Sequence, residues 1–185
     1  MIETVLPVTP FFDIGGGLTL ASDRPALVNL AKGATRILEI GINAGGTAKL
    51  LLSNIPSIVS YVGIDVPSDF ITVLALQQRE VPKIAGHRVA DDPRVKIILK
   101  STKEVVPTEI GECDFVFIDG DHSADGVERD TTLARACVKR GVIVWHDYRV
   151  GEAHTEINTV LDRWVDSGAP ILHVKGTWLA FERVG

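Results

Sequence analysis

The sequence predicts a doubly wound α/β fold whose seven-stranded, mostly parallel sheet carries a C-terminal antiparallel hairpin. Short β-rich runs alternate with helical patterns from Thr35 onward, which is typical of βαβ units in a sheet covered on both faces. The last two β-rich runs are joined by a very short turn, which only antiparallel strands allow. The length of 185 residues fits one domain, with residues 1–34 as an N-terminal segment with the first helix and 35–185 as the core.

The expected strands and helices follow one another in a regular order. Five strands are predicted in crossover units, at Arg36–Ile40, Ile58–Asp65, Arg94–Leu99, Cys113–Asp119 and Gly141–Asp147. Helices are predicted at Ser22–Lys32, Thr47–Ile55, Ser101–Glu109, Val127–Lys139 and Glu156–Gly168, with a further helical region over Asp69–Ala90. The charged run Glu128–Asp130 is expected on a solvated helix face. The tail Ile171–Val184 is predicted to form the hairpin around Lys175–Gly176, and Asp13–Gly17 a flexible, glycine-rich entry to the first helix.

The composition indicates a folded protein that binds neither nucleic acid nor membrane. Apolar residues make up 45% of the chain, charged residues 23%, and the mean hydropathy is +0.20. The net charge of −5 repels a phosphate backbone, and no cluster of Lys and Arg offsets it. No segment approaches the roughly 20 apolar residues of a membrane helix, and the amino terminus lacks a basic start followed by an apolar run. We therefore expect a soluble, cytoplasmic protein.

A glycine-rich stretch, LEIGINAGGT at Leu38–Thr47, joins the first core strand to the helix that follows it. Such a loop exposes unpaired N–H groups and the positive end of a helix dipole, and Gly41, Gly45 and Gly46 allow a ligand to approach the backbone. The spacing G-x-x-x-G-G differs from the dinucleotide pattern G-x-G-x-x-G, and the acidic Glu39 precedes the loop. This pattern disfavours a pyrophosphate and predicts a different nucleotide-like cofactor.

S-adenosylmethionine fits these residues because it has no phosphate and presents a cationic end and two ribose hydroxyls. We expect Glu39 to hold the cationic end, directly or through neighbouring backbone groups. Asp65 ends the next strand, nineteen residues after Gly46, and is expected to accept hydrogen bonds from the ribose.

The motifs LEIGINAGGT and GID resemble those of the class I S-adenosylmethionine-dependent methyltransferases. The resemblance runs from about Thr35 to the carboxyl terminus and implies a Rossmann-like methyltransferase fold. It implies a set of cofactor-binding residues, namely Glu39, Gly41, Asn43, Gly45, Gly46, Thr47 and Asp65. In this family the end of the third strand flanks the adenine, which nominates Ser101 and Thr102. Asp119 is a further candidate, binding the cofactor through water.

A second cluster of polar residues follows two later strands, in FIDGDHS at Phe117–Ser123 and WHD at Trp145–Asp147. The carboxyl ends of adjacent parallel strands meet at the edge where ligands bind in open α/β sheets. Asp119 and Asp147 are expected to bind a hard divalent cation such as Mg²⁺, which prefers one or two carboxylates. His122 and Asp121 are the candidates for the base that removes a proton from the methyl acceptor.

The same two motifs resemble the small metal-dependent O-methyltransferases, which act on sugar hydroxyls and catechol-like phenols. The resemblance implies metal ligands at Asp119 and Asp147 and a base at His122. Many relatives have Asp-Asn or Glu-Asp after the fifth strand, whereas this chain has His146–Asp147–Tyr148. The third metal ligand and the identity of the metal are therefore open. The ion could be Mg²⁺, or it could be a softer ion that accepts His146 as a ligand, because imidazole suits Zn, Fe or Ni better than Mg²⁺.

These features predict methyl transfer from S-adenosylmethionine to a hydroxyl of a small molecule, sugar or phenol-like, with divalent-metal assistance. The alternatives are a metal-independent methyltransferase, a non-catalytic module that binds a nucleoside-like ligand or a partner protein, and a hydride-transferring oxidoreductase. Acceptor choice rests with residues before Thr35 and with the loops Pro67–Asp92, Ser123–Val127 and Arg149–Thr155, none of which carries a readable code. Either the site is open to a bulky acceptor, or a second subunit completes it in a homodimer.

Overall fold

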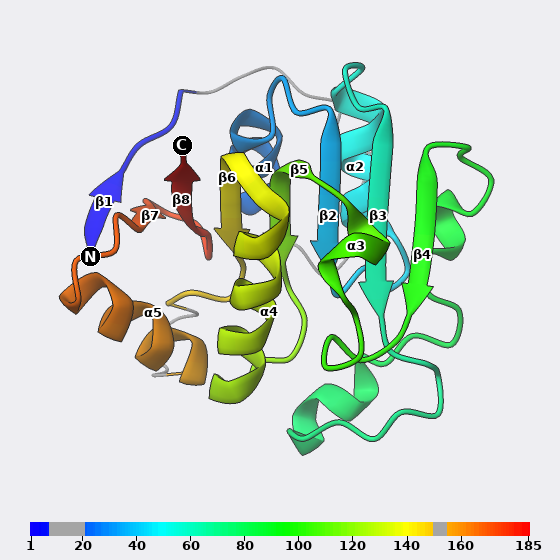
Figure 1. The fold of residues 1–185 in the computed structure, drawn as a ribbon. Helices are drawn as coiled ribbons and strands as arrows, with labels where there is room; N and C mark the ends of the chain where they lie inside the picture. The colour runs from blue at the N-terminus through cyan, green and yellow to red at the C-terminus, as the bar shows by residue number, and fades with distance from the viewer. Residues whose placement is uncertain (8–20, 150–154) are drawn as a thin grey trace.

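A computed structural model describes residues 1–7, 21–149 and 155–185, arranged around one eight-stranded sheet (Figure 1). The strand order is β1-β7-β8-β6-β5-β2-β3-β4. The strands are β1 (Ile2–Thr4), β2 (Arg36–Ile40), β3 (Ser60–Asp65), β4 (Val95–Leu99), β5 (Cys113–Ile118), β6 (Val138–Trp145), β7 (Leu172–Val174) and β8 (Ala180–Val184). The predicted fold class is confirmed: all pairs are parallel except those of β8, which runs antiparallel to both β6 and β7.

The predicted count of seven strands is wrong by one. The additional strand, β1, lies at the edge of the sheet and pairs in parallel with β7, which is about 170 residues away along the chain. Three residues are too few to show an alternating pattern, and a distant partner leaves no local signal. The predicted glycine-rich entry at Asp13–Gly17 and residues 150–154 of the predicted acceptor loop lie outside the described residues.

Helices cover both faces of the sheet (Figure 1). They are α1 (Asp23–Leu30), α2 (Gly46–Asn54), α3 (Pro107–Ile110), α4 (Ala124–Cys137) and α5 (Glu156–Asp166), with 3-10 turns η1 (Ala75–Arg79) and η2 (His87–Val89). Figure 1 shows α1 and α2 behind the sheet and α3, α4 and α5 in front of it. In the described part of the chain, no helix is long and apolar enough to cross a membrane.

Two helix predictions need correction, and proline contributes to both. The region Asp69–Ala90 holds only η1 and η2, because Pro82 lacks an N–H and disfavours a helical conformation in the residue before it. Gly86, with φ +67°, interrupts the same region a second time. The helix expected over Ser101–Glu109 covers only Pro107–Ile110, because proline is tolerated in the first turn of a helix but not in its interior.

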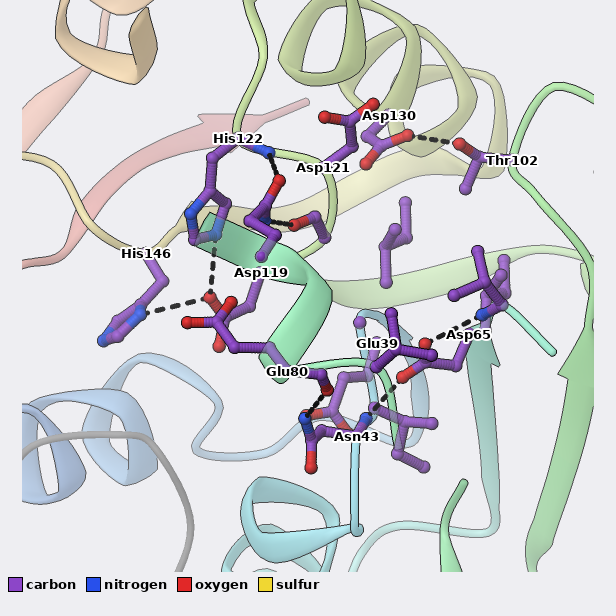
Figure 2. A pocket seen from close by; sticks show the side chains of 18 of the residues that line it. Glu39, Asn43, Asp65, Glu80, Thr102, Asp119, Asp121, His122, Asp130 and His146 are labelled. Carbon is purple, nitrogen blue, oxygen red and sulfur yellow. Dashed lines mark hydrogen bonds and ion pairs between the residues drawn. The ribbon is translucent and has the colours of Figure 1, made fainter. Parts of the chain in front are cut away.

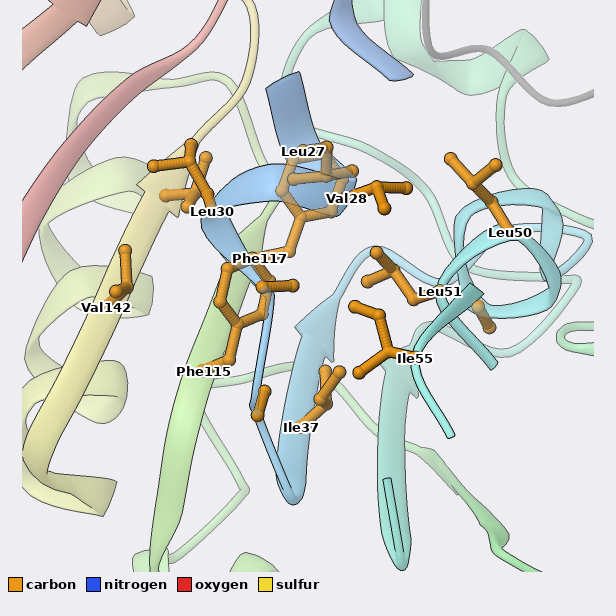
Figure 3. Packing of buried hydrophobic residues seen from close by; sticks show 14 of the residues in the cluster. Leu27, Val28, Leu30, Ile37, Leu50, Leu51, Ile55, Phe115, Phe117 and Val142 are labelled. Atoms are coloured by element: carbon orange, nitrogen blue, oxygen red, sulfur yellow. The ribbon is translucent and has the colours of Figure 1, made fainter. Parts of the chain in front are cut away.

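The buried side chains form two apolar layers, one on each face of the sheet. Figure 3 shows the layer beneath α1 and α2, where Leu27 and Leu51 meet Ile37, Phe115 and Phe117 from the central strands. The second layer lies under α4 and α5. Each fully buried Leu or Phe contributes roughly 1.5–3 kcal/mol. The two layers fix the strand register and, with it, the positions of the loops at the carboxyl ends of the strands.

The strand order reverses between β2 and β5. The chain passes from β2 to β3 and β4 on one side, and returns to β5 and β6 on the other. Asp119, which follows β5, donates its N–H to the carbonyl oxygen of Ile40 at the end of β2 (2.8 Å). Ligands bind at such a reversal in open α/β sheets because the two connecting loops diverge there and leave a crevice.

Candidate cofactor and active site

The loop between β2 and α2 is shaped by two glycines in the left-handed region. Gly41 has φ +89°, and a Cβ added there would lie 2.0 Å from the carbonyl oxygen of Asp119. Gly45 has φ +88° and forms the N-cap of α2. A Cβ on Gly45 would meet Val89 and Gly86, so this glycine serves loop packing. Only glycine adopts these angles without strain and permits such close packing.

Asp65 anchors the same loop from the end of β3. Its Oδ2 accepts the N–H of Asn43 (2.6 Å), and its Oδ1 accepts the N–H of Val66 (2.8 Å). Partial burial raises the pKa of Asp65, and the two N–H groups oppose that shift. Each carboxylate oxygen retains a second lone pair, so Asp65 keeps acceptor capacity toward the cavity that it lines.

Glu39 lies beneath the loop and is 1% exposed. The hydroxyl of Tyr61 donates to its Oε2 (2.7 Å). Burial raises the pKa of Glu39 well above its usual value, while hydrogen bonds from Tyr61 and Thr47 work against this. Glu39 was expected to hold the cationic end of the cofactor either directly or through neighbouring backbone groups. Its burial favours the second mode, in which the surrounding loop makes the contact, over a direct ion pair.

A cavity of about 590 Å³ opens at the carboxyl ends of the central strands, within the usual size range of small-molecule sites. The loop residues Gly41, Asn43, Gly46 and Thr47 line it, together with Ser101. Residues that follow β5 and β6 also line it, as do apolar side chains before and after η1. These are Asp119, Asp121, His122, His146, Asp147, Phe70, Val73 and Val81. The structure thus brings most of the predicted site residues to one cavity.

Asp130 also lines this cavity, although the sequence was interpreted as placing it on a solvated helix face. It is 1% exposed, and Thr102 Oγ1 donates to its Oδ1 (2.6 Å; Figure 2). Arg129 Nε in turn donates to Thr102 Oγ1 (2.9 Å). Burial raises the pKa of Asp130 to about 6. The helical period could have predicted that Asp130 is buried, because Asp130 falls three residues after the buried Val127 on the apolar face of α4.

Asp119, His146 and Asp147 converge after β5 and β6. The parallel register that pairs Ile118 with Trp145 brings the next residues, Asp119 and His146, abreast. His146 Nδ1 lies 3.2 Å from an oxygen of Asp119 and 3.2 Å from an oxygen of Asp147. One ligand atom from each of the three residues lies within 4.8 Å of the others. The three predicted metal ligands therefore form one cluster.

Electrostatic coupling holds this cluster together. Burial by itself would lower the pKa of His146, but the charge of Asp119 and hydrogen bonds to Asp119, Asp147 and Asp23 raise it far above its usual value. Conversely, His146 and His122 overcome the effect of burial on Asp119 and lower its pKa to about 2. Two carboxylates and one imidazole nitrogen are a donor set that suits a divalent transition ion.

The two candidate bases differ in their surroundings. His122 Nε2 lies 3.6 Å from Asp119 and 3.4 Å from Asp147, and its side chain is 25% exposed toward the cavity. Burial opposes protonation of His122, but Asp119 outweighs it and raises the pKa. Asp121 accepts hydrogen bonds from Arg129 (3.1 Å) and from the N–H of Ser123 (3.0 Å). Against the effect of burial, these contacts lower the pKa of Asp121, which makes it the weaker base at neutral pH.

Three residues near the site gave no sequence signal, because their partners are far away along the chain. Gln77 of η1 donates to the carbonyl oxygen of Gly120 (2.9 Å) and accepts the N–H of His122 (3.2 Å). Glu80 points toward Asp119 in Figure 2. Burial and the charges of Asp119 and Asp147 raise the pKa of Glu80, while His122 lowers it. The third residue, Asp23 of α1, contacts His146 from the side away from the cluster.

Comparisons with known proteins agree with this description. A family model described as "Methyltransferase domain" matches residues 38–148. The O-methyltransferase TomG from Streptomyces achromogenes, solved with SAM, is 19% identical with a TM-score of 0.62, over 90% of this chain and 81% of that one. The SAH-bound Podospora anserina methyltransferase PaMTH1 is 16% identical with a TM-score of 0.62, over 88% of this chain and 78% of that one. A spermidine synthase in complex with the transition-state analogue AdoDATO is 18% identical with a TM-score of 0.56, over 89% of this chain and 59% of that one. A search of curated proteins gave no match.

Proposed function

This chain belongs to the methyltransferase-domain family, and we propose that it methylates a hydroxyl oxygen of a small molecule with S-adenosylmethionine and a divalent metal ion. One observation carries the proposal. The backbone of Asp119 packs against Gly41 of the glycine-rich loop, while the side chain of Asp119 belongs to the Asp119–His146–Asp147 cluster. A single residue thus joins the cofactor side of the cavity to the metal side, which favours direct transfer between them.

The cofactor assignment uses the loop residues and the end of β3. Gly46 and Thr47, at the start of α2, line the cavity, and the positive end of the helix dipole there suits the carboxylate of the methionine part. Asp65 suits the ribose hydroxyls, and Ser101 and Thr102, which line the same cavity after β4, would flank the adenine. Asp130, held by Thr102, is an acceptor suited to the adenine amino group.

A metal ion would be held by Asp119, His146 and Asp147. When bound, it supplies a Lewis acid that lowers the pKa of an acceptor hydroxyl and orients it. The acceptor proton passes to His122 Nε2, which faces both carboxylates of the cluster. With S-adenosylmethionine bound, the acceptor oxygen would form the new O–C bond as the S–C bond breaks, and S-adenosylhomocysteine would leave. The products are the methyl ether, S-adenosylhomocysteine and a proton on His122.

A metal-independent reaction at the same site is the second candidate. The observation that favours it is the position of His146 between Asp23, Asp119 and Asp147. A protonated imidazole there neutralises part of the acidic cluster, and the cluster then positions the acceptor without an ion.

Two measurements test the proposal. Titration calorimetry with S-adenosylmethionine, S-adenosylhomocysteine and NAD tests the cofactor, and binding of NAD alone would overturn it. Methyl transfer to a panel of catechols and sugar hydroxyls, before and after exhaustive chelation, then separates the two mechanisms. We expect Asp119→Asn to abolish transfer. The control is Asp114→Asn, which removes a carboxylate that accepts the N–H groups of Thr35 and Arg36 at the far end of β2. Activity that survives chelation would favour the metal-independent reaction.

A further inference from the structure

Asp23, the first residue of α1, carries a fully buried carboxyl group. An acidic residue in the first turn of a helix ordinarily faces solvent and stabilises the helix dipole. Asp23 is instead 0% exposed, and its Oδ2 lies 3.0 Å from His146 Nε2. Its Oδ1 accepts the N–H of Trp178 from the turn between β7 and β8 (3.0 Å). The side chain therefore joins α1 to two segments more than 120 residues away.

The ring of His146 presents its two nitrogens to two different groups. The ring is 4% exposed and packs between Phe117 (5.8 Å between centroids) and Trp178 (6.1 Å). Nδ1 faces Asp119 and Asp147, whereas Nε2 faces Asp23. For Nδ1 to bind a metal ion, its lone pair must be free and the proton must lie on Nε2. Asp23 is placed to accept that proton in a hydrogen bond.

We propose that Asp23 is a positioning residue of the metal site, which fixes the proton of His146 on Nε2 and so directs the lone pair of Nδ1 to a transition ion held with Asp119 and Asp147. The inference rests on the proposed metal site. A carboxylate behind a metal-binding histidine orients the ring and raises its basicity, and its loss typically lowers metal affinity about 10–100-fold. With imidazole as the third ligand, the site should prefer Zn²⁺ or Co²⁺ to Mg²⁺.

The substitution Asp23→Asn tests the proton position directly. In the parent, one carboxylate oxygen accepts the Trp178 N–H and the other faces His146. Asparagine has a single carbonyl oxygen, and if that oxygen keeps the bond to Trp178, the NH₂ group faces His146 Nε2. An NH₂ donor requires an unprotonated Nε2, which moves the proton to Nδ1 and blocks metal binding. The isosteric change therefore favours the wrong tautomer of His146.

Calorimetry with Zn²⁺, Co²⁺ and Mg²⁺ on the full chain measures the effect, with the visible absorption of bound Co²⁺ and the nitrogen NMR of the Zn²⁺-loaded His146 ring as further readouts. We expect Asp23→Asn to weaken Zn²⁺ and Co²⁺ binding roughly 10–100-fold, to change the Co²⁺ spectrum and to move the ring proton, while binding of S-adenosylhomocysteine is retained. Leu30→Ala is the matched control, because it removes a buried side chain from the same helix and leaves the contact between Asp23 and His146 in place. It should leave metal affinity within about twofold while lowering stability.

The outcomes separate this inference from the proposed function. If His146→Ala weakens Zn²⁺ binding but Asp23→Asn does not, the role of Asp23 is wrong and the metal site stands. If Asp23→Asn and Leu30→Ala weaken metal binding equally, Asp23 acts through helix stability, and the positioning role is wrong. If the parent binds S-adenosylhomocysteine but neither Zn²⁺ nor Co²⁺, both the metal site and the role of Asp23 fail while the cofactor assignment stands.

Discussion

A methyl group added at Gly41 would collide with the backbone of Asp119, at the contact that links the glycine-rich loop to the cluster of Asp119, His146 and Asp147. In Gly41→Ala the new Cβ would lie 2.0 Å from the carbonyl oxygen and 2.5 Å from the carbonyl carbon of Asp119. These are backbone atoms, so no side-chain rotation relieves the overlap. Either the end of β2 or the end of β5 must move, although they are joined by the hydrogen bond from the Asp119 N–H to Ile40.

Two terms set the size of the expected effect. An L-residue at φ +89° in the left-handed region costs about 1–2 kcal/mol. Overpacking against a well-packed neighbour costs a further 1–3 kcal/mol or so. The free energy of unfolding should therefore fall by roughly 2–5 kcal/mol. Gly33→Ala is the matched control, because Gly33 has φ +83° with nothing within 4 Å of its Cβ position, and this variant carries the strain term alone.

Urea unfolding followed by circular dichroism measures both variants, and calorimetry with S-adenosylhomocysteine measures the site. We expect Gly41→Ala to lose about 1–3 kcal/mol more than Gly33→Ala and to bind the cofactor product more weakly. Gly33→Ala should bind it as the parent does. Equal losses of stability in the two variants would refute the steric argument, and unchanged cofactor binding in Gly41→Ala would refute the placement of the loop.

Three further predictions concern stability. Relative to the parent, Asp130→Asn should gain up to about 3 kcal/mol as the pH rises from about 4 to about 6, and should keep this gain at higher pH. Burial raises the pKa of folded Asp130 to about 6, so over this range the unfolded carboxyl ionises while the folded one stays protonated, and the parent loses stability. Urea unfolding of both proteins across this range checks it, and a difference independent of pH would contradict it. Tyr61→Phe should lower the free energy of unfolding by about 1–3 kcal/mol, because the buried Glu39 loses a donor; a loss below about 0.5 kcal/mol would count against that bond. Thr155→Ala should lower the free energy of unfolding by about 1 kcal/mol, because it removes the side chain that accepts the Asn158 N–H at the start of α5. Thr155→Ser keeps a hydroxyl at this position and should retain most of the stability in the same assay.

Local patterns in the sequence were sufficient for most of the fold. The strand at Arg36–Ile40 was predicted to the residue, and the strand at Cys113–Asp119 to within one position, because buried parallel strands are continuous apolar runs. The glycine spacing of Leu38–Thr47 marked the cofactor loop for a similar reason: positive φ angles and close packing allow few other residues. The helical expectation over Asp69–Ala90 failed where Pro82 and Gly86 interrupt the pattern.

The tertiary structure decided what depends on contacts between distant segments. The sequence nominated Asp119, His146 and Asp147, but the register between β5 and β6 brought their side chains together. The contact between Asp23 and His146 spans 123 residues, and no spacing rule reaches across that distance. Sequence alone therefore determined the central strands, the glycine-rich loop and the family resemblance, since each of these depends on a few neighbouring residues. Only the packed sheet determined which carboxyl groups are buried and which lie beside His146, because both properties depend on contacts between distant segments.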